Sequence, residues 1–240
     1  MEGLLPPGLV PFTGLSGSLG LTQSAKFFQS DRRTGPHCNG NNDGMSFTVR
    51  PAVPADAAAL AACAAVTFPL ACPPSSDPRD IQRFLETELS ESRFAERLGD
   101  PDRMILCVEL HPPGDASDAA GSTKRGLGGY SMLVRTQPDD ALIRGALTVL
   151  PAVELSKFYI DPAHHGAGAA RALMEASLET AAGTGMPGIW LGVNQENERA
   201  IRFYSRSGFR IAGTKTFRLG GRLEDDYILE RSLTGSFTGG

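Results

Sequence analysis

At 240 residues, the chain is long enough for one domain with a buried core and some additional segments. Its content of 41% hydrophobic and 21% charged residues is ordinary for a soluble globular protein. The formal net charge of −4 argues against nucleic acid as the main ligand, because phosphate binding needs a basic face, and it is compatible with a cationic substrate.

The cysteines and the apolar stretches indicate a cellular compartment. The four cysteines form no CxxC pair and have no histidine at metal-ligand spacing, so no metal site is expected. Cys63 and Cys107 lie inside apolar runs and are predicted to be buried small hydrophobes. No stretch approaches the roughly 18 apolar residues of a membrane span, and the N-terminus has no basic region that would suit a signal peptide. We therefore expect a cytoplasmic protein with neither a membrane nor a nucleic acid as partner.

Composition divides the chain into three parts. Residues 1–44 are rich in Gly, Ser, Pro and Asn without sustained periodicity, and we predict a disordered N-terminal extension there. The predicted domain spans residues 45–233. Residues 234–240 are predicted to form a flexible tail.

The predicted elements of the domain alternate between strands and helices. A strand at 47–50 precedes an alanine-rich helix at 57–66, which Asp56 can cap. The elements predicted next are an amphipathic stretch from Asp77 or Asp80 to about residue 98, a strand at 104–108, a hairpin loop at 112–125 and a strand at 129–135. After an irregular connection at 137–151, we predict a strand at 153–160, a helix at 166–182, a strand at 189–193, a helix at 198–206 and strands at 209–217 and 227–229. The order β-α-α-β-β-β-α-β-α-β-β indicates an α/β fold in which the strands at 153–160 and 189–193 form a right-handed βαβ crossover.

The segment from Tyr159 to Arg171 carries the strongest functional signal. A strand runs through a turn of small residues directly into a helix, which exposes backbone N–H groups at the positive end of the helix dipole and suits a pyrophosphate. The alternative is a helix N-terminus that packs closely on a sheet. A P-loop motif is absent, and Arg171 stands where a dinucleotide fingerprint starting at Gly166 would need its third small residue.

Two motifs in this half of the chain resemble those of the GCN5-related N-acetyltransferase family. The family signature Gln/Arg-x-x-Gly-x-Gly/Ala reads here as His165-Gly166-Ala167-Gly168-Ala169-Ala170, in which His165 replaces the usual first residue. The pattern Asn-x-x-Ala-x-x-x-Tyr-x-x-x-Gly-Phe falls on Asn197, Ala200, Tyr204, Gly208 and Phe209. The resemblance covers residues 46 to about 233. It implies a single α/β domain with a mixed sheet of about seven strands flanked by about four helices, and acetyl-coenzyme A as cosubstrate.

The resemblance also implies roles for individual residues. Tyr204 would lie near the cofactor sulfur and protonate the leaving thiolate, although a helical tyrosine can also serve packing alone. Glu154 would act as a base through water, the alternative being a solvated or ion-paired strand glutamate. The positions that would contact the cofactor are Phe158, Tyr159, Ile160, His165, Gly166, Ala167, Gly168, Ala169, Ala170, Arg171, Asn197, Ala200 and Tyr204, with a backbone N–H near Tyr159 or Ile160 donating to the thioester oxygen. Strand alternation predicts that Glu154, Ser156, Phe158 and Ile160 share one face.

A narrower resemblance concerns the substrate. Thr67-Phe68 with the helical stretch after it, and residues 189–201, look like bacterial spermidine/spermine N-acetyltransferases, although those enzymes tend to carry a glutamate at the position of Ser156. This implies a small polyamine as acceptor, with carboxylates supplied by Asp80, Glu86, Glu88 and Glu91, or else a solvated helix face. The rival functions are a protein or peptide N-acetyltransferase and a non-catalytic acetyl-coenzyme A sensor. The sequence leaves open whether the protein is a monomer or a homodimer.

Overall fold

The computed structural model describes residues 46–73, 75–111, 126–164, 168–219 and 222–234. The predicted N-terminal extension, the whole hairpin loop at 112–125 and nearly all of the predicted tail lie outside these ranges, so those three statements stay predictions.

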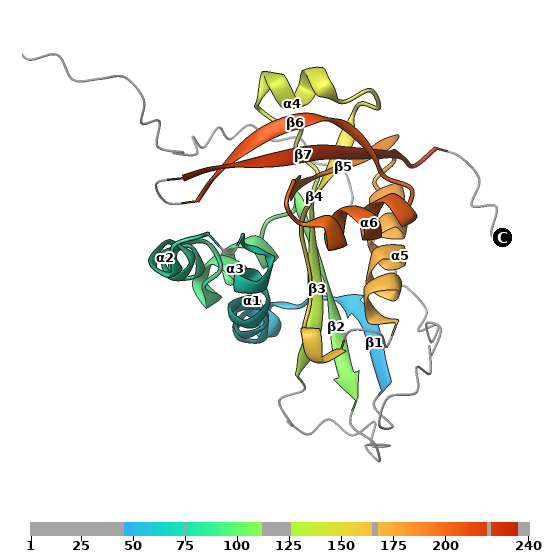
Figure 1. The fold of residues 1–240 in the computed structure, drawn as a ribbon. Coiled ribbons are helices and arrows are strands. Elements are labelled where there is room, and N and C mark those ends of the chain that lie inside the picture. The colour runs from blue at the N-terminus through green and yellow to red at the C-terminus, as the bar shows by residue number, and fades with distance from the viewer. Residues whose placement is uncertain (1–45, 74, 112–125, 165–167, 220–221, 235–240) are drawn as a thin grey trace, which may run out of the picture. The chain divides into compact units, whose positions relative to one another are not determined.

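Within the described residues, seven strands form one mixed sheet in the order β1-β2-β3-β4-β5-β7-β6 (Figure 1). All neighbouring strands are antiparallel except β4 and β5. The strands are β1 (Ser46–Pro51), β2 (Arg103–His111), β3 (Leu127–Val134), β4 (Ala152–Ile160), β5 (Gly188–Asn194), β6 (Arg210–Leu219) and β7 (Arg222–Ser232). The predicted α/β fold and the parallel β4–β5 pair on either side of a helix are confirmed.

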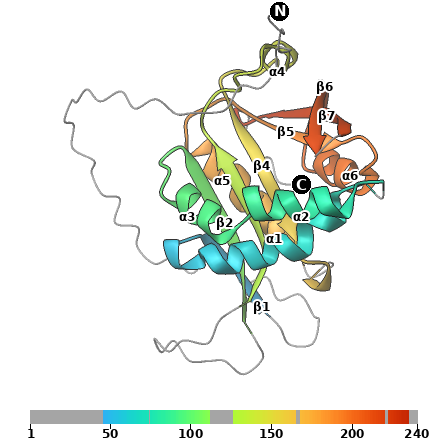
Figure 2. The same cartoon turned by 90° about the vertical axis from the view of Figure 1, so that its left-hand side faces the viewer.

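Helices cover both faces of this sheet. Helices α1 (Ala57–Ala71), α2 (Pro78–Glu88) and α3 (Glu91–Leu98) lie on one face, whereas α5 (Ala169–Ala182) and α6 (Glu198–Arg206) lie on the other (Figure 2). The predicted amphipathic stretch is two helices, because the chain breaks at Leu89 and Ser90.

A short helix, α4 (Ala141–Ala146), lies where an irregular connection was predicted, so that prediction is wrong. The carboxylate of Asp140 accepts a hydrogen bond from the backbone N–H of Leu142 at 2.7 Å, which caps the helix. Six residues provide too little periodicity for a sequence pattern to reveal such a helix.

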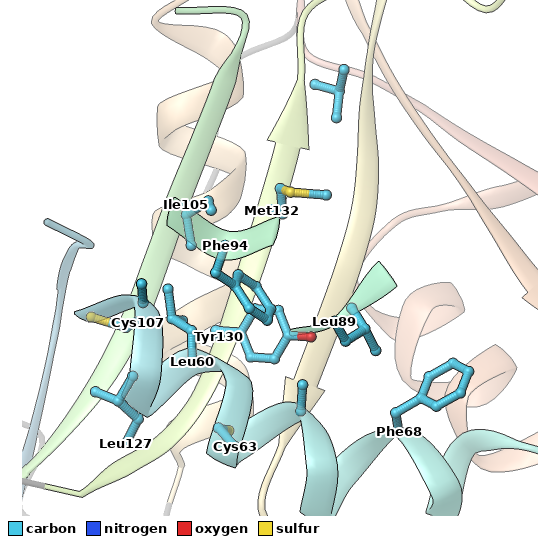
Figure 3. Close-up of a cluster of buried hydrophobic side chains, with 13 residues drawn as sticks. Leu60, Cys63, Phe68, Leu89, Phe94, Ile105, Cys107, Leu127, Tyr130 and Met132 are labelled. Carbon is cyan, nitrogen blue, oxygen red and sulfur yellow. The ribbon is translucent and has the colours of Figure 1, made fainter. Parts of the chain in front are cut away.

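The two faces of the sheet have separate cores. On the side of α1 to α3, Phe94 packs edge-on against Tyr130 with ring centroids 5.4 Å apart, and Leu60 and Leu89 surround them (Figure 3). On the side of α5 and α6, the core consists of Leu133, Val153, Met174, Leu178, Ile189, Leu191 and their neighbours. Both helix layers are therefore held by apolar burial against the same central strands.

The predicted burial of Cys63 and Cys107 is confirmed, with exposed fractions of 7% and 0%. Both cysteines and Cys72 are free thiols. Burial raises the pKa of Cys63 to about 12 and that of Cys107 to about 11, which keeps both thiols protonated and unreactive.

Helix α1 is more apolar than expected. The 18 residues Pro54–Ala71 have a mean hydropathy of 1.4 and would be long and apolar enough to cross a membrane by length and composition alone. The expectation that no stretch approaches such a span is wrong on this measure. A core helix passes the same test, and α1 buries Leu60 and Ala64 completely against the sheet.

A buried carboxylate fixes the connection that leads into β4. Glu230 of β7 is 1% exposed and accepts hydrogen bonds from the backbone N–H of Thr148 at 2.8 Å and from its hydroxyl at 2.7 Å. Arg210 pairs with the same carboxylate at 2.8 Å. These contacts tie the entrance of β4 to the far side of β5.

Candidate active site

Strands β4 and β5 pair only at their beginning. Their register runs from Ala152 opposite Gly188 to Glu154 opposite Trp190, and it ends there. Beyond this point the strands separate, and β5 no longer pairs with β4. A cavity of about 290 Å³ lies at the opening, lined by the end of α1, the start of α6, and parts of β4, β5, β6 and β7.

Strand β4 carries a bulge at Ser156. Lys157 lies opposite Met132 of β3, whereas Leu155 lies opposite Leu133, so Ser156 has no partner of its own in this ladder. A bulge places two residues of one strand opposite one residue of the other, which interrupts the alternation of faces.

The bulge overturns the predicted arrangement of side chains on β4. Phe158 and Ile160 pack toward α5 and α6. Glu154 lies on the opposite face, where it lines the cavity and interacts electrostatically with Lys157. The prediction that Glu154, Ser156, Phe158 and Ile160 share one face is therefore wrong, because the extra residue reverses the alternation between Glu154 and Phe158.

The backbone of β4 presents donors to the opening. Asp161 donates its N–H to the carbonyl of Gly128 at 2.9 Å, and hydrogen-bonded positions alternate along an antiparallel pair. The N–H of Tyr159 is therefore directed to β3, whereas those of Phe158 and Ile160 are directed to the side from which β5 has separated. Tyr159 and Ile160 are the predicted donors to the thioester oxygen. Of these two, only Ile160 directs its N–H to the opening, and Phe158 directs its N–H there as well.

Tyr204 lines the cavity from α6. It is 8% exposed, and its ring packs against Phe158, Phe203 and Phe209 at centroid distances of 6.2, 5.6 and 5.9 Å. Burial raises the pKa of its phenol well above the ordinary value, so the hydroxyl is protonated at neutral pH. The aromatic cluster fixes the ring, and a protonated hydroxyl at the cavity wall can donate a proton or a hydrogen bond.

The N-terminus of α6 also borders the cavity. Asn197 caps the helix, and its side-chain oxygen accepts a hydrogen bond from the backbone N–H of Ala200 at 3.0 Å. Both residues line the cavity, which brings them close to Tyr204 as the motif predicts. The side-chain amide of Asn197 retains donors for a ligand.

The predicted phosphate-binding turn is described only in its second part. His165, Gly166 and Ala167 lie outside the described residues. Gly168 is the N-cap of α5 with φ of +83°, and among the described residues beyond its chain neighbours and the backbone of α5, no atom lies within 4 Å of the position that a Cβ would occupy there. The helix begins at Ala169 rather than at Gly166, and Ala172 is the first residue to donate to the turn, to the carbonyl of Gly168. The N–H groups of Ala169 and Ala170 precede that bond and lie in the first turn, whose N–H groups a helix start leaves for a ligand.

A second hollow lies between α5 and α6. Three arginines line it, namely Arg171, Arg206 and Arg231, together with the apolar side chains of Met174, Leu178 and Phe203. Glu175 and Glu179 also line this hollow, and Glu175 pairs with Arg171 at 2.7 Å, so its rim carries charges of both signs.

The carboxylates predicted to bind the acceptor do not reach the cavity. Asp80 pairs with Arg83 at 3.3 Å, Glu88 pairs with Arg97 at 3.3 Å, and neither they nor Glu86 and Glu91 line the opening. The charge of Asp80 is used within α2, and that of Glu88 in a pair between α2 and α3.

Two other carboxylates line the cavity from β7. Glu224 and Asp226 are 7% and 8% exposed, and Asp226 pairs with Lys215 of β6 at 3.2 Å. Burial raises the pKa of Asp226 although Lys215 opposes the shift. Sequence reasoning missed both residues because the last strand was predicted only at 227–229, whereas β7 begins at Arg222. Their alternation with the apolar Ile228 was the available signal.

In the described part of the chain, no group of three or more His, Cys, Asp or Glu side chains is arranged to hold a metal ion.

Comparison with known proteins identifies this arrangement. A family model described as the Acetyltransferase (GNAT) family matches residues 126–209. An uncharacterized N-acetyltransferase of Mycobacterium tuberculosis, Rv2669, is 48% identical over 178 residues, which cover 74% of this chain and 98% of that protein. A mycothiol acetyltransferase from Nocardioides sp. is 34% identical over 133 residues, covering 54% of this chain and 40% of that protein. The solved structure of a PaiA N-acetyltransferase from Thermoplasma acidophilum in complex with coenzyme A has the same fold, with a TM-score of 0.58 at 16% identity over 78% of this chain and 99% of that one.

The fold, the opening between β4 and β5 and the start of α5 after Gly168 are those of a coenzyme A-dependent acyltransferase. The chain belongs to the GNAT family and is an N-acetyltransferase that uses acetyl-coenzyme A.

Proposed function

We propose that this enzyme acetylates a small primary amine, and that the amine is a polyamine such as spermidine or spermine. The observation that carries this proposal is the cavity at the β4–β5 opening, in which Tyr204 and the buried carboxylates of Glu224 and Asp226 line one space. In this proposal Tyr204 acts on the leaving thiol, and Glu224 and Asp226 bind the cationic acceptor.

The described residues fit acetyl-coenzyme A. At Gly168 the left-handed backbone and the empty Cβ position leave room for phosphates against the N–H groups of Ala169 and Ala170. The edge of β4 at Phe158 offers a backbone donor to an extended arm that takes the place of β5. When bound, acetyl-coenzyme A supplies an activated acyl group as a thioester.

Tyr204 is proposed as the acid of the reaction. Expulsion of a thiolate is easier when a nearby donor protonates the sulfur, and the Tyr204 phenol stays protonated inside its aromatic cluster. The N–H of Phe158 is proposed to donate to the thioester oxygen, where negative charge develops.

Glu154 is proposed as the base. A free alkyl amine has a pKa of about 10.4, so less than about one molecule in a thousand is neutral at pH 7. Glu154 lines the cavity on the face of β4 opposite α5, which suits removal of a proton from the amine through one water molecule. Its position at the last β4–β5 pair supports this role, since the strands begin to separate there.

The polyamine is proposed because the acids of the cavity outnumber its bases. Glu154, Glu224 and Asp226 face the cavity with Lys157 and Lys215, which leaves one uncompensated negative charge when all five are ionised. Burial removes water from a carboxylate, so a bound cation stabilises a buried carboxylate more than an exposed one.

The experiment is a release assay for free coenzyme A thiol across matched acceptors: butylamine, putrescine, spermidine, spermine and a lysine-containing peptide. We expect kcat/KM to rise with the number of amines, and the advantage of the longer amines to shrink as salt screens the charges. If the peptide is acetylated and the polyamines are not, the polyamine proposal is wrong and a protein acetyltransferase takes its place.

A further inference from the structure

We propose that Lys157 favours the neutral, nucleophilic form of the bound acceptor amine by charge repulsion. The inference rests on the proposed function, since it concerns the same cavity and the same reacting nitrogen. It adds an activating residue that neither family motif contains.

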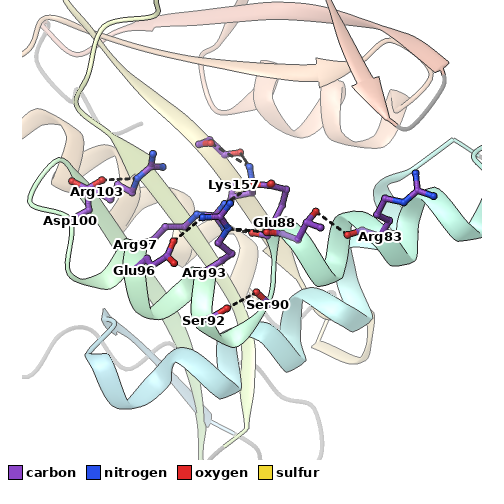
Figure 4. A network of polar contacts seen from close by, with 12 residues as sticks. Arg83, Glu88, Ser90, Ser92, Arg93, Glu96, Arg97, Asp100, Arg103 and Lys157 are labelled. Atoms are coloured by element: carbon purple, nitrogen blue, oxygen red, sulfur yellow. Dashed lines mark hydrogen bonds and ion pairs between the residues drawn. The ribbon is translucent and has the colours of Figure 1, made fainter. Parts of the chain in front are cut away.

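The position of Lys157 is the first support. It follows the bulge at Ser156 directly, lines the cavity, and lies on the same face of β4 as Glu154. Figure 4 shows Lys157 among the polar side chains of α2 and α3. The next residue, Phe158, directs its backbone N–H to the opening where the thioester is proposed to bind. The ammonium group is thus carried by the strand segment that holds the reacting groups.

The bonding of the ammonium is the second support. Its Nζ donates to the carbonyl oxygen of Ser156 at 3.2 Å and to the Ser156 hydroxyl at 3.4 Å, both neutral acceptors. Among the described residues, Lys157 forms no ion pair within 4.0 Å. By contrast, Lys215 in the same cavity pairs with Asp226. A partly buried cation without a carboxylate partner loses solvation without compensation, so its field extends into the cavity.

The charged groups around Lys157 come from four elements. Glu154 of β4 and Glu88 of α2 stabilise its protonated form, whereas Arg97 of α3 and Arg103 of β2 oppose it. Burial dominates and lowers the pKa of Lys157 to about 8. At pH 7 the ammonium is therefore still protonated in roughly nine molecules of ten, and its charge is present under ordinary conditions.

The chemistry follows from repulsion between like charges. A protonated acceptor amine beside Lys157 is destabilised relative to its neutral form, so the proton passes more readily to the Glu154 carboxylate through water. The neutral nitrogen then forms the C–N bond while the C–S bond breaks, and Tyr204 gives its proton to the leaving sulfur. The acylated nitrogen loses one proton, which restores the Tyr204 phenol through water. Lys157 keeps its own proton throughout.

The test compares pH profiles of Lys157→Met and Lys157→Arg with the wild type, using spermidine and the thiol-release assay. We expect Lys157→Met to lower kcat about tenfold at pH 7, the effect of one pKa unit on the acceptor, while KM stays the same or falls because a repulsive cation is gone. The ratio of wild-type to Met rates should be largest below about pH 8 and approach one as pH rises through the pKa of Lys157. Lys157→Arg, which stays charged, should retain the rate at pH 7 and keep its advantage over Met above pH 9.

Arg93→Met is the matched control, because it removes one positive charge from α3 outside the cavity and should leave the profile unchanged. A higher KM with unchanged kcat in Lys157→Met would overturn the inference and indicate that Lys157 binds an anionic group of the acceptor. An equal loss at every pH, not rescued by arginine, would assign Lys157 a structural role and overturn it as well. Absence of turnover in the wild type with every amine would refute the proposed function itself, and the inference with it.

Discussion

Gly168 offers a test of cofactor binding in which strain and contact can be separated. Its φ of +83° disfavours any residue with a side chain, and a residue other than glycine in this region costs about 1–2 kcal/mol. For a domain of this size, that cost lowers Tm by about 2–8 °C. Because, among the described residues beyond its chain neighbours and the backbone of α5, no atom lies within 4 Å of the added Cβ, Gly168→Ala should still fold.

The same methyl group points into the space proposed for the phosphates. We therefore expect calorimetry to show that Gly168→Ala binds coenzyme A at least about tenfold more weakly, a loss of about 1.4 kcal/mol. Gly185 is the matched control, since it has φ of +78° and an equally empty Cβ position in the turn that follows α5. Gly185→Ala should show a similar fall in Tm with unchanged affinity. Equal affinities in the two folded variants would refute the reasoning.

Three further substitutions probe the acid, the core and the entrance of β4. Tyr204→Phe should lower kcat roughly a hundredfold with little change in coenzyme A affinity, because the hydroxyl acts mainly in the transition state, and wild-type turnover would reduce Tyr204 to packing. Tyr130→Phe removes a fully buried hydroxyl that has no hydrogen-bond partner among the described residues, so urea unfolding should show a gain of about 1 kcal/mol, and a loss of similar size would show that the hydroxyl has a partner. Glu230→Gln should cost about 2 kcal/mol, because the charged acceptor of both Thr148 hydrogen bonds is lost, and an unchanged Tm would show that this carboxylate does not hold the connection.

The sequence predicted what depends on local patterns. Apolar periodicity predicted the strands β4 and β5 and the helices around them, and one short motif placed Asn197, Ala200 and Tyr204 on one helix and its cap. The structure places these three at one cavity, which confirms their proximity. Their roles in catalysis stay proposals.

What the sequence did not predict depends on pairing between strands. The bulge at Ser156 arises from the register of β3 against β4, and no single-strand pattern reveals it. Without the bulge, alternation assigned Phe158 to the face of Glu154, and Lys157 to the opposite one. The acidic residues of the cavity, Glu224 and Asp226, were missed for a similar reason, since β7 inserts between β5 and β6 and only this order brings its carboxylates to the opening.

The most direct test of the central claim is mass spectrometry of the acceptor after incubation of the enzyme with acetyl-coenzyme A and spermidine. The account predicts a spermidine product that carries one added acetyl group, formed in step with an equal amount of free coenzyme A thiol and strongly reduced in Tyr204→Phe. If the protein binds acetyl-coenzyme A but acetylates neither spermidine nor any other amine, the catalytic account is contradicted and the fold serves as a sensor of the cofactor.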